Sequence, residues 1–261
     1  MATYLDRILE RHRENAAGDT RTLGELVAQT AAMPPCRGFR AALMTSPEIA
    51  VIAEIKRRSP SKGDLDADLD PAATALAYQS GGASCLSVLT DEEFFGGSVA
   101  DLKTARSAVA LPVIRKDFTV DPRDVADARL IGADAVLLIA AALDPFELAD
   151  LHELATELGL DTLVEVHDEP ELEEAMNAGA SLIGVNQRDL VTFEVDHQRA
   201  ERMAKAIPDG VVKIAESGVR DADDARRLAD AGYDAILVGE TLVTSGDPAK
   251  AVRALRVARP R

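Results

Sequence analysis

Eight short runs rich in valine, isoleucine, leucine and alanine recur along the chain, and each precedes a segment with helical character. The runs are continuously apolar, which is typical of strands buried on both faces of a parallel sheet. Strands that alternate with helices in this way restrict the chain to an α/β fold. We predict strands at Val51–Lys56, Cys85–Leu89, Val113–Lys116, Ala135–Ile139, Thr162–Val166, Leu182–Asn186, Val211–Ala215 and Ala235–Val238.

The segments between the runs carry helix boundary signals. Three helices are predicted to begin with an aspartate N-cap before a proline, at Asp70, Asp121 and Asp144. Four are predicted to end at a glycine just before the next strand, at Gly82, Gly132, Gly179 and Gly232. The repeated order of cap, helix, glycine and strand indicates one helix after each strand.

Eight such units in 261 residues favour a single (β/α)8 TIM barrel. A doubly wound open sheet is the alternative, but it usually has fewer strands, and no GxGxxG follows the first strand. Residues 1–45 precede the first strand and are predicted to be helical at Tyr4–Ala16 and Leu23–Ala31. We interpret 1–45 as an N-terminal helical extension capping the barrel, and 46–261 as the barrel, within one structural domain overall.

Composition excludes several classes of protein. Hydrophobic residues make up 47% of the chain, which is too many for a disordered protein, and no apolar run approaches the ~18 residues of a membrane span. A net charge of −16 argues against a nucleic-acid partner. Two cysteines cannot supply a disulfide framework or a four-cysteine zinc site, and the histidines show no metal-ligand spacing. We expect a cytoplasmic protein with no membrane partner and no metal, and histidines on the surface.

Charged and polar side chains stand at or near the ends of five predicted strands. In a TIM barrel the C-terminal strand ends surround the active site, and burying charges there is costly unless they are paired or used. A structural ion-pair network is the alternative interpretation, but five strands contributing such residues favour a catalytic site. The candidates are Glu54, Lys56, Lys116, Glu165, Asn186 and Glu216.

Three loops rich in glycine and serine are predicted to meet at the same end of the barrel. The first contains Ser59, and the other two contain Ser217-Gly218 and Gly239-Glu240. Hydroxyl groups and closely approaching backbone amides suit a phosphate, and loops 7 and 8 commonly hold one in such barrels. We therefore expect a small phosphorylated substrate.

A series of motifs, one per strand, carries a family resemblance. The strings VIAEIKRRSPSKG, VIRKDF, LLIAAAL, LVEVH, GVNQRDL, IAESG and ILVGETLV occur in this order. Together they closely resemble indole-3-glycerol phosphate synthases, and the resemblance covers nearly the whole chain. It implies conversion of 1-(2-carboxyphenylamino)-1-deoxyribulose 5-phosphate into indole-3-glycerol phosphate, with loss of CO2 and water and without a cofactor. It leaves open whether another enzyme of tryptophan biosynthesis binds as a partner.

The resemblance also implies roles for individual residues. Lys116 would be the general acid at the ketose oxygen, Lys56 would hold the departing carboxylate, and Glu165 would act in the dehydration; which lysine donates the first proton stays open. Three further residues would orient these side chains and adjust their acidity: Glu54, Asn186 and Glu216. The substrate-binding residues implied are Ser59, Phe95, Phe118, Arg188, Ser217, Gly218, Gly239 and Glu240. Gln187 departs from the family's motif, which often has a second asparagine there.

Two further expectations complete the analysis. Desolvation and neighbouring lysines are expected to lower the pKa of a catalytic lysine toward working pH. A phosphosugar isomerase of the same barrel type and a non-catalytic phosphate-binding barrel are the alternative functions. The isomerase is disfavoured because Lys56 ends the first predicted strand with no cysteine beside it.

Overall fold

Eight parallel strands close into a barrel in the computed structural model, which describes residues 3–189 and 191–260. Neighbours follow the order β1-β10-β9-β8-β7-β6-β5-β4, and β4 pairs with β1 to close the ring. The strands are β1 (Ala50–Ile55), β4 (Cys85–Leu89), β5 (Val113–Lys116), β6 (Ala135–Ile139), β7 (Asp161–Val166), β8 (Leu182–Asn186), β9 (Val212–Glu216) and β10 (Ala235–Val238). The predicted (β/α)8 barrel is confirmed.

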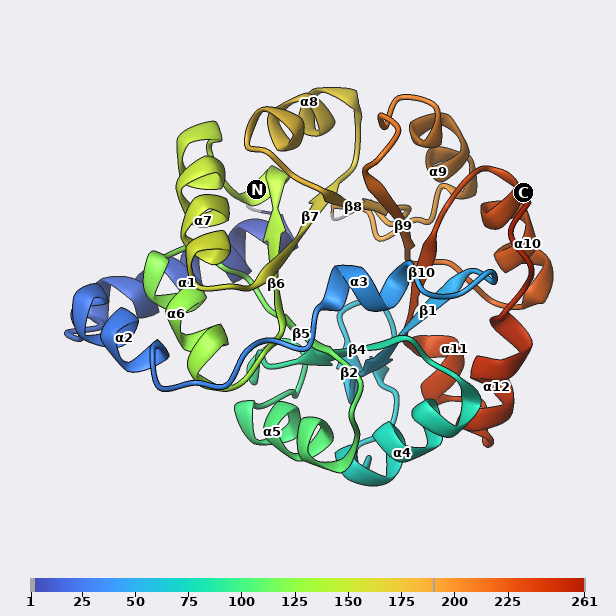
Figure 1. Cartoon of the computed structure of the whole chain (residues 1–261), viewed down its shortest axis with the longest axis horizontal. Coiled ribbons are helices and arrows are strands. Elements are labelled where there is room, and N and C mark those ends of the chain that lie inside the picture. The colour runs from blue at the N-terminus through green and yellow to red at the C-terminus, as the bar shows by residue number, and fades with distance from the viewer. Residues whose placement is uncertain (1–2, 190, 261) are drawn as a thin grey trace.

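Helices surround the barrel (Figure 1). They are α4 (Pro71–Gly81), α5 (Val99–Ala108), α6 (Pro122–Leu130), α7 (Pro145–Glu157), α8 (Glu169–Asn177), α9 (His197–Ala204), α10 (Ala222–Asp230), α11 (Glu240–Val243) and α12 (Pro248–Leu255), with a 3-10 turn, η1, at Ala140–Ala142. The three predicted aspartate caps accept backbone hydrogen bonds at the starts of α4, α6 and α7. The four predicted glycines all have positive φ. No helix in the described ranges is long and apolar enough to cross a membrane.

Three strands differ from the sequence prediction by one residue at one or both ends, and β7 begins at Asp161, one residue earlier than predicted. β1 ends at Ile55, so Lys56 follows the strand instead of ending it. β9 runs from Val212 to Glu216 and therefore includes the carboxylate that ends it. A two-stranded antiparallel hairpin, β2 (Arg58–Ser59) with β3 (Gly63–Asp64), was not predicted and gives the serine-rich loop after β1 a defined shape.

Two apolar cores hold the barrel together. One lies between the strands and the surrounding helices and includes Val51, Leu86 and Leu138, which are fully shielded from solvent. The other fills the barrel interior and includes Ile52 and Ile114. Side chains on a strand alternate between these two layers, so Glu54 shares the inward face with Ile52 and lies toward the open end. This alternation places the polar strand ends above a packed interior.

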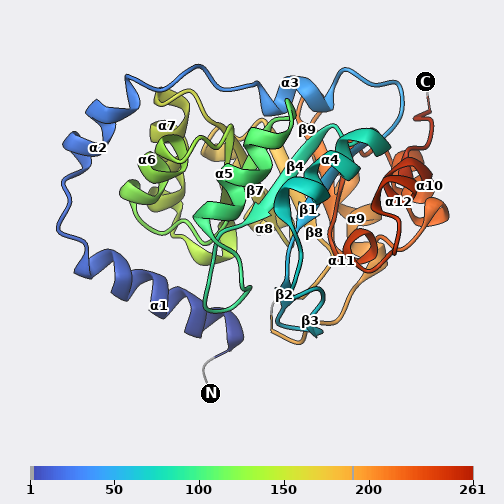
Figure 2. The ribbon, with the colours of Figure 1, turned by 90° about the horizontal axis from the view of Figure 1, so that it is seen from below.

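The N-terminal segment touches both ends of the barrel (Figure 2). Its helices are α1 (Tyr4–Gly18), α2 (Leu23–Thr30) and α3 (Phe39–Leu43). Phe39 and Leu43 of α3 are completely buried in the interior core and close the end opposite the polar strand ends. α1 lies at the other end, on the side of the β2–β3 hairpin.

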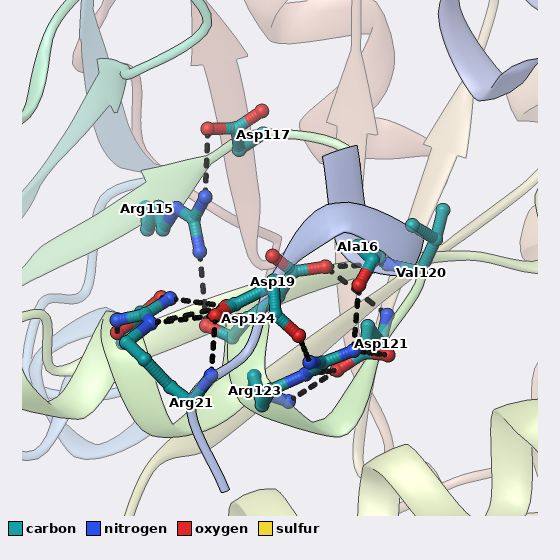
Figure 3. Close-up of polar contacts among 10 residues, drawn as sticks. Ala16, Asp19, Arg21, Arg115, Asp117, Val120, Asp121, Arg123 and Asp124 are labelled. Atoms are coloured by element: carbon teal, nitrogen blue, oxygen red, sulfur yellow. Dashed lines mark hydrogen bonds and ion pairs between the residues drawn. The ribbon is translucent and has the colours of Figure 1, made fainter. Parts of the chain in front are cut away.

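Polar contacts attach the segment around α1 to the β5–α6 region (Figure 3). Arg123 donates to the carbonyls of Ala16 and Asp19, and Arg21 donates to both carboxylate oxygens of Asp127. Ile8 adds a buried apolar contact from α1. The segment is therefore fixed to the barrel by side chains from both partners.

Candidate active site

A cavity of about 740 Å³ opens at the C-terminal ends of the barrel strands. Such ends carry the active site in TIM-barrel enzymes. All fourteen residues predicted for the site line this cavity: Glu54, Lys56, Ser59, Phe95, Lys116, Phe118, Glu165, Asn186, Arg188, Glu216, Ser217, Gly218, Gly239 and Glu240.

Lys116 lies between two carboxylates from other strands. Its Nζ is 3.2 Å from Glu165 Oε2 and 3.5 Å from Glu216 Oε2. Both carboxylates are almost completely buried, at 2% exposure each. Lys116 ends β5, Glu165 lies in β7 and Glu216 ends β9, so the barrel assembles the group from alternate strands.

The pKa shifts of this group run opposite to the expectation for a catalytic lysine. Burial lowers the pKa of Lys116, but the carboxylates of Glu165, Glu216 and Glu54 outweigh burial and raise it. The predicted lowering is therefore wrong for Lys116. Burial, with Glu165 and Glu54 nearby, instead raises the pKa of Glu216 to about 7, although Lys116 opposes this.

Glu54 and Lys56 form a second ion pair at the end of β1. Ser87 in β4 donates to Glu54 Oε2 over 3.4 Å. Together with the Lys116 group, the site holds three carboxylates and two ammonium groups. Burial, followed by this excess of negative charge, raises the pKa of the Glu216 carboxyl to about 7.

Glu165 has a different partner on each oxygen. Asn186 Nδ2 donates to Oε1 over 2.9 Å, and Lys116 donates to Oε2. Burial raises the pKa of Glu165, but Lys116, His167 and the Asn186 hydrogen bond lower it overall. The Asn186 carbonyl accepts from Arg199, which fixes its backbone. The structure therefore holds Glu165 ionised beside a protonated lysine.

The predicted phosphate loops line one region of the cavity. Within the described chain, the amides of Gly218 and Gly239 donate no hydrogen bond to protein, which leaves them free for an anion. Ser217 has a positive φ of 66°, a strained conformation for a residue with a side chain. The side chain of Glu240 is 41% exposed and approaches Lys62 at 3.7 Å, so part of its charge is offset.

An apolar wall stands at another side of the cavity. The rings of Phe95 and Phe118 have centroids 6.1 Å apart and an interplanar angle of 37°. Arg188 donates from Nη1 to the carbonyl of Phe193, which holds the guanidinium in the loop after β8. The cavity therefore combines an aromatic surface, a charged centre and a glycine-rich region.

Three supporting residues were not assigned a role from the sequence. A Cβ at Gly184, within β8, would collide with Glu216 Oε1, so only glycine leaves room for that carboxylate. An isolated glycine inside a predicted strand is the signal that could have identified it. Gln187 is 1% exposed and donates to the carbonyl of Ser217 over 2.7 Å. His167 lies 3.6 Å from Glu165.

The expectation that the histidines lie on the surface holds only in part, because all four are partly buried and none is fully exposed. His12 of α1 contacts Asp91 at 2.9 Å and lies 3.8 Å from Asp117, a grouping with the ligand types of a metal site. Asp91 also accepts from the amide of Phe94, and Asp117 pairs with Arg115. We interpret the group as an attachment of α1 to two loops of the cavity.

Comparison with known proteins identifies the family of the chain. The family model of indole-3-glycerol phosphate synthase matches residues 5–255. An indole-3-glycerol phosphate synthase of Rhodococcus jostii is 51% identical over 252 residues, covering 96% of this chain and 93% of that protein. Indole-3-glycerol phosphate synthase 2 of Streptomyces coelicolor is 52% identical over 235 residues, covering 90% and 91%.

A solved structure shares the fold at low identity. Thiamine phosphate pyrophosphorylase from Pyrococcus furiosus superposes with a TM-score of 0.60 at 18% identity, covering 79% of this chain and 93% of that one. This likeness concerns the barrel alone. The family match and the sequence identities carry the assignment, and the chain therefore belongs to the indole-3-glycerol phosphate synthase family of tryptophan-biosynthetic lyases.

Proposed function

We propose that Lys116, Lys56 and Glu165 carry out the decarboxylative ring closure of this family in the cavity, without a cofactor. The observation that supports this most directly is the placement of Lys116 between Glu165 and Glu216 beside the Glu54–Lys56 pair. The groups come from β5, β7, β9 and the end of β1, and all of them line the same cavity.

In ring closure, the ring carbon that bears the carboxylate attacks the ketose carbon, and a new C–C bond forms. Lys116 donates a proton to the ketose oxygen, which becomes a hydroxyl group. The carboxylate leaves as CO2, and its bonding electrons restore the aromatic ring; Lys56 holds this carboxylate until it departs. Protonation of Glu216 removes a negative charge beside Lys116 and so lowers the pKa of this lysine. Glu216 therefore adjusts how readily Lys116 donates its proton.

Dehydration then completes the indole. The new hydroxyl leaves as water, and a proton leaves the neighbouring carbon. In the resting site Glu165 accepts hydrogen bonds from Lys116 and Asn186. In the dehydration step Glu165 accepts that proton. Lys56 donates the proton with which the hydroxyl group leaves as water. Asn186 and Glu54 orient these groups without taking a proton.

Substrate binding divides between two regions of the cavity. Ser59 and the backbone at Ser217, Gly218, Gly239 and Glu240 bind the phosphate, since glycine-rich loops after the last two barrel strands suit an anion. Phe95 and Phe118 pack against the aromatic ring, and Arg188 assists at that end. The reaction therefore takes place between a fixed phosphate and a fixed ring.

Two broader assignments belong to the same proposal. Residues 1–45 cap the barrel and residues 46–261 form it, within one domain, because α1 contacts cavity loops and α3 fills the opposite end. The protein works in the cytoplasm, where its acidic charge and free cysteines are suited to a reducing, aqueous compartment.

A turnover assay with 1-(2-carboxyphenylamino)-1-deoxyribulose 5-phosphate tests the proposed site. The wild type should produce the indole fluorescence of the product without added metal or cofactor. Replacing Lys116 with methionine should abolish it, whereas replacing the exposed Glu173 with glutamine should leave it unchanged. Full activity in the Lys116→Met variant would contradict the assignment of the acid.

A further inference from the structure

His167 lies between a carboxylate of the active site and a carboxylate of an outer helix. It follows β7 directly, two residues after Glu165, and Glu171 follows in the first turn of α8. Neither His167 nor Glu171 lines the cavity. The mechanism above does not use either residue.

Glu171 fixes the histidine through two hydrogen bonds. Its Oε2 accepts from the backbone amide of His167 over 2.7 Å and from the ring Nδ1 over 3.0 Å. The ring therefore keeps one orientation, and its Nδ1 carries a proton, because a carboxylate oxygen can only accept.

The other ring nitrogen is directed at the active site. Nε2 of His167 is buried, has no hydrogen-bond partner among the described residues, and lies 3.6 Å from Glu165 Oε1. This distance is too long for a hydrogen bond but close enough for an ion pair. A buried nitrogen without a partner is costly, which indicates a functional reason for its placement.

The electrostatics of the three residues agree with a charged ring. Burial lowers the pKa of His167, but the hydrogen bond that its ring donates to Glu171 and the charges of Glu165 and Glu171 raise this pKa overall. The positive charge of Arg199 in α9 opposes this and lowers the pKa of His167. In turn, the imidazolium is one of the groups that lower the pKa of Glu165.

We propose that His167, held by Glu171, is a positioning residue that places a positive charge beside Glu165 and keeps that carboxylate ionised for the dehydration step. The inference rests on the role proposed above for Glu165. Lys116 donates its proton early in the reaction, so its charge is lost when Glu165 must act as a base. His167 is a second cation that the reaction does not consume.

Imidazole NMR titration tests the charge linkage without reference to activity. The chain has four histidines, so replacing His167 identifies its signal. We expect the pKa of His167 to lie above that of a free histidine and to fall in both Glu165→Gln and Glu171→Gln. The exposed Glu173→Gln on the same helix removes the same charge and should not change it. A His167 titration insensitive to Glu165→Gln would overturn the inference.

The pH dependence of kcat tests the consequence for catalysis. His167→Gln keeps a polar group near Glu165 without the charge, and Glu171→Gln removes the group that keeps the ring protonated. In both, the acidic limb of kcat should move up by about one pH unit, with kcat recovering at high pH and KM unchanged. A loss of kcat that is equal at every pH would mean a purely structural role and would overturn the inference.

Glu165→Gln separates the two proposals. If this variant keeps full turnover, the base role of Glu165 is wrong, whatever the imidazole titration shows. If it loses turnover while His167→Gln leaves the acidic limb in place, the role of Glu165 stands and the inference about His167 fails.

Discussion

Lys116 and Glu216 lie 3.5 Å apart in the cavity, and the pKa of each is raised. Glu216 Oε1 has no hydrogen-bond partner among the described residues. The raised pKa of the lysine follows from three surrounding carboxylates, and that of the glutamate follows from burial and the same excess negative charge. Lys116 therefore stays protonated at working pH, and Glu216 is the group that titrates there.

Replacing Lys116 with methionine should abolish product formation, because no later step can occur without ring closure. Loss of a general acid costs about 10²–10⁴-fold, and loss of the charge that stabilises the transition state adds to this. CO2 release and indole fluorescence should fall together in a single turnover. Lys56→Met is the matched comparison: a larger loss of ring closure there would assign the first proton to Lys56.

Glu165→Gln should slow dehydration more than ring closure. The amide keeps the shape of the side chain and its contact with Asn186, but it cannot accept a proton. In a single turnover, CO2 should appear before indole, and a hydroxylated indoline should accumulate. If CO2 and indole are instead delayed equally, Glu165 only positions Lys116 and has no separate role.

The stability of Glu216→Gln relative to the wild type should rise with pH. The pKa of Glu216 is about 7 in the folded protein and near 4.5 when unfolded. The folded state therefore binds the proton more tightly, and the wild type loses this stabilisation as pH rises from about 4.5 through 7. The variant has no such loss. Its free energy of unfolding, measured by urea denaturation, should therefore increase relative to that of the wild type by on the order of 1–3 kcal/mol between pH 5 and pH 8. Parallel midpoints at all pH values would contradict the raised pKa.

Phosphate or sulfate should bind at the loops after β9 and β10, against the amides of Gly218 and Gly239 and the hydroxyl of Ser59. Crystals grown with sulfate provide the direct measurement, and inorganic phosphate should compete with the substrate. Ser59→Ala should raise KM several-fold with little change in kcat, since this contact does not change during the reaction. An anion found elsewhere, with these amides facing solvent, would remove the basis for the phosphate site.

Removing residues 1–45 should raise KM and lower the melting temperature, and two smaller changes separate these effects. Phe39→Ala opens the interior core and should cost about 3–5 kcal/mol of stability. Replacing His12 with alanine detaches α1 from Asp91 and should act mainly on KM, because the loops that carry Phe95 and Phe118 lose a support. Unchanged kinetics and melting in the full deletion would refute a capping role.

The strands and the site were predictable because their signals are local. Continuous apolar runs and aspartate-proline caps mark each barrel unit, and the C-terminal strand ends then select Lys116, Glu165 and Glu216 as neighbours. The series of motifs then reduced the possible families to one. These features depend on short segments and on a symmetrical architecture. The positions of the strands and of the site residues can therefore be predicted without knowing which side chains are in contact.

Three features could not be predicted because they depend on contacts between segments that are far apart in the sequence. The direction of the Lys116 pKa shift follows from the number of carboxylates around it, which only the folded site defines. The burial of His12 requires α1 to reach loops far along the chain. The packing of α3 also could not be predicted, because Phe39 contacts interior residues that come from many strands. In addition, a helix of five residues gives only a weak periodic signal in the sequence.

Closure of the barrel joins the beginning of the chain to its end, and this has a consequence for synthesis. β1 pairs with β4 on one edge and with β10 on the other, where Ala50 lies opposite Ala235. The second edge of β1 is therefore covered only when β10 has been added. Translation delivers β1 early and β10 last, and until then both edges of an incomplete sheet are open to pairing with other chains. The barrel therefore cannot close until β10 has been made, and pairing of this last strand with β1 covers the edge that would otherwise be open to aggregation.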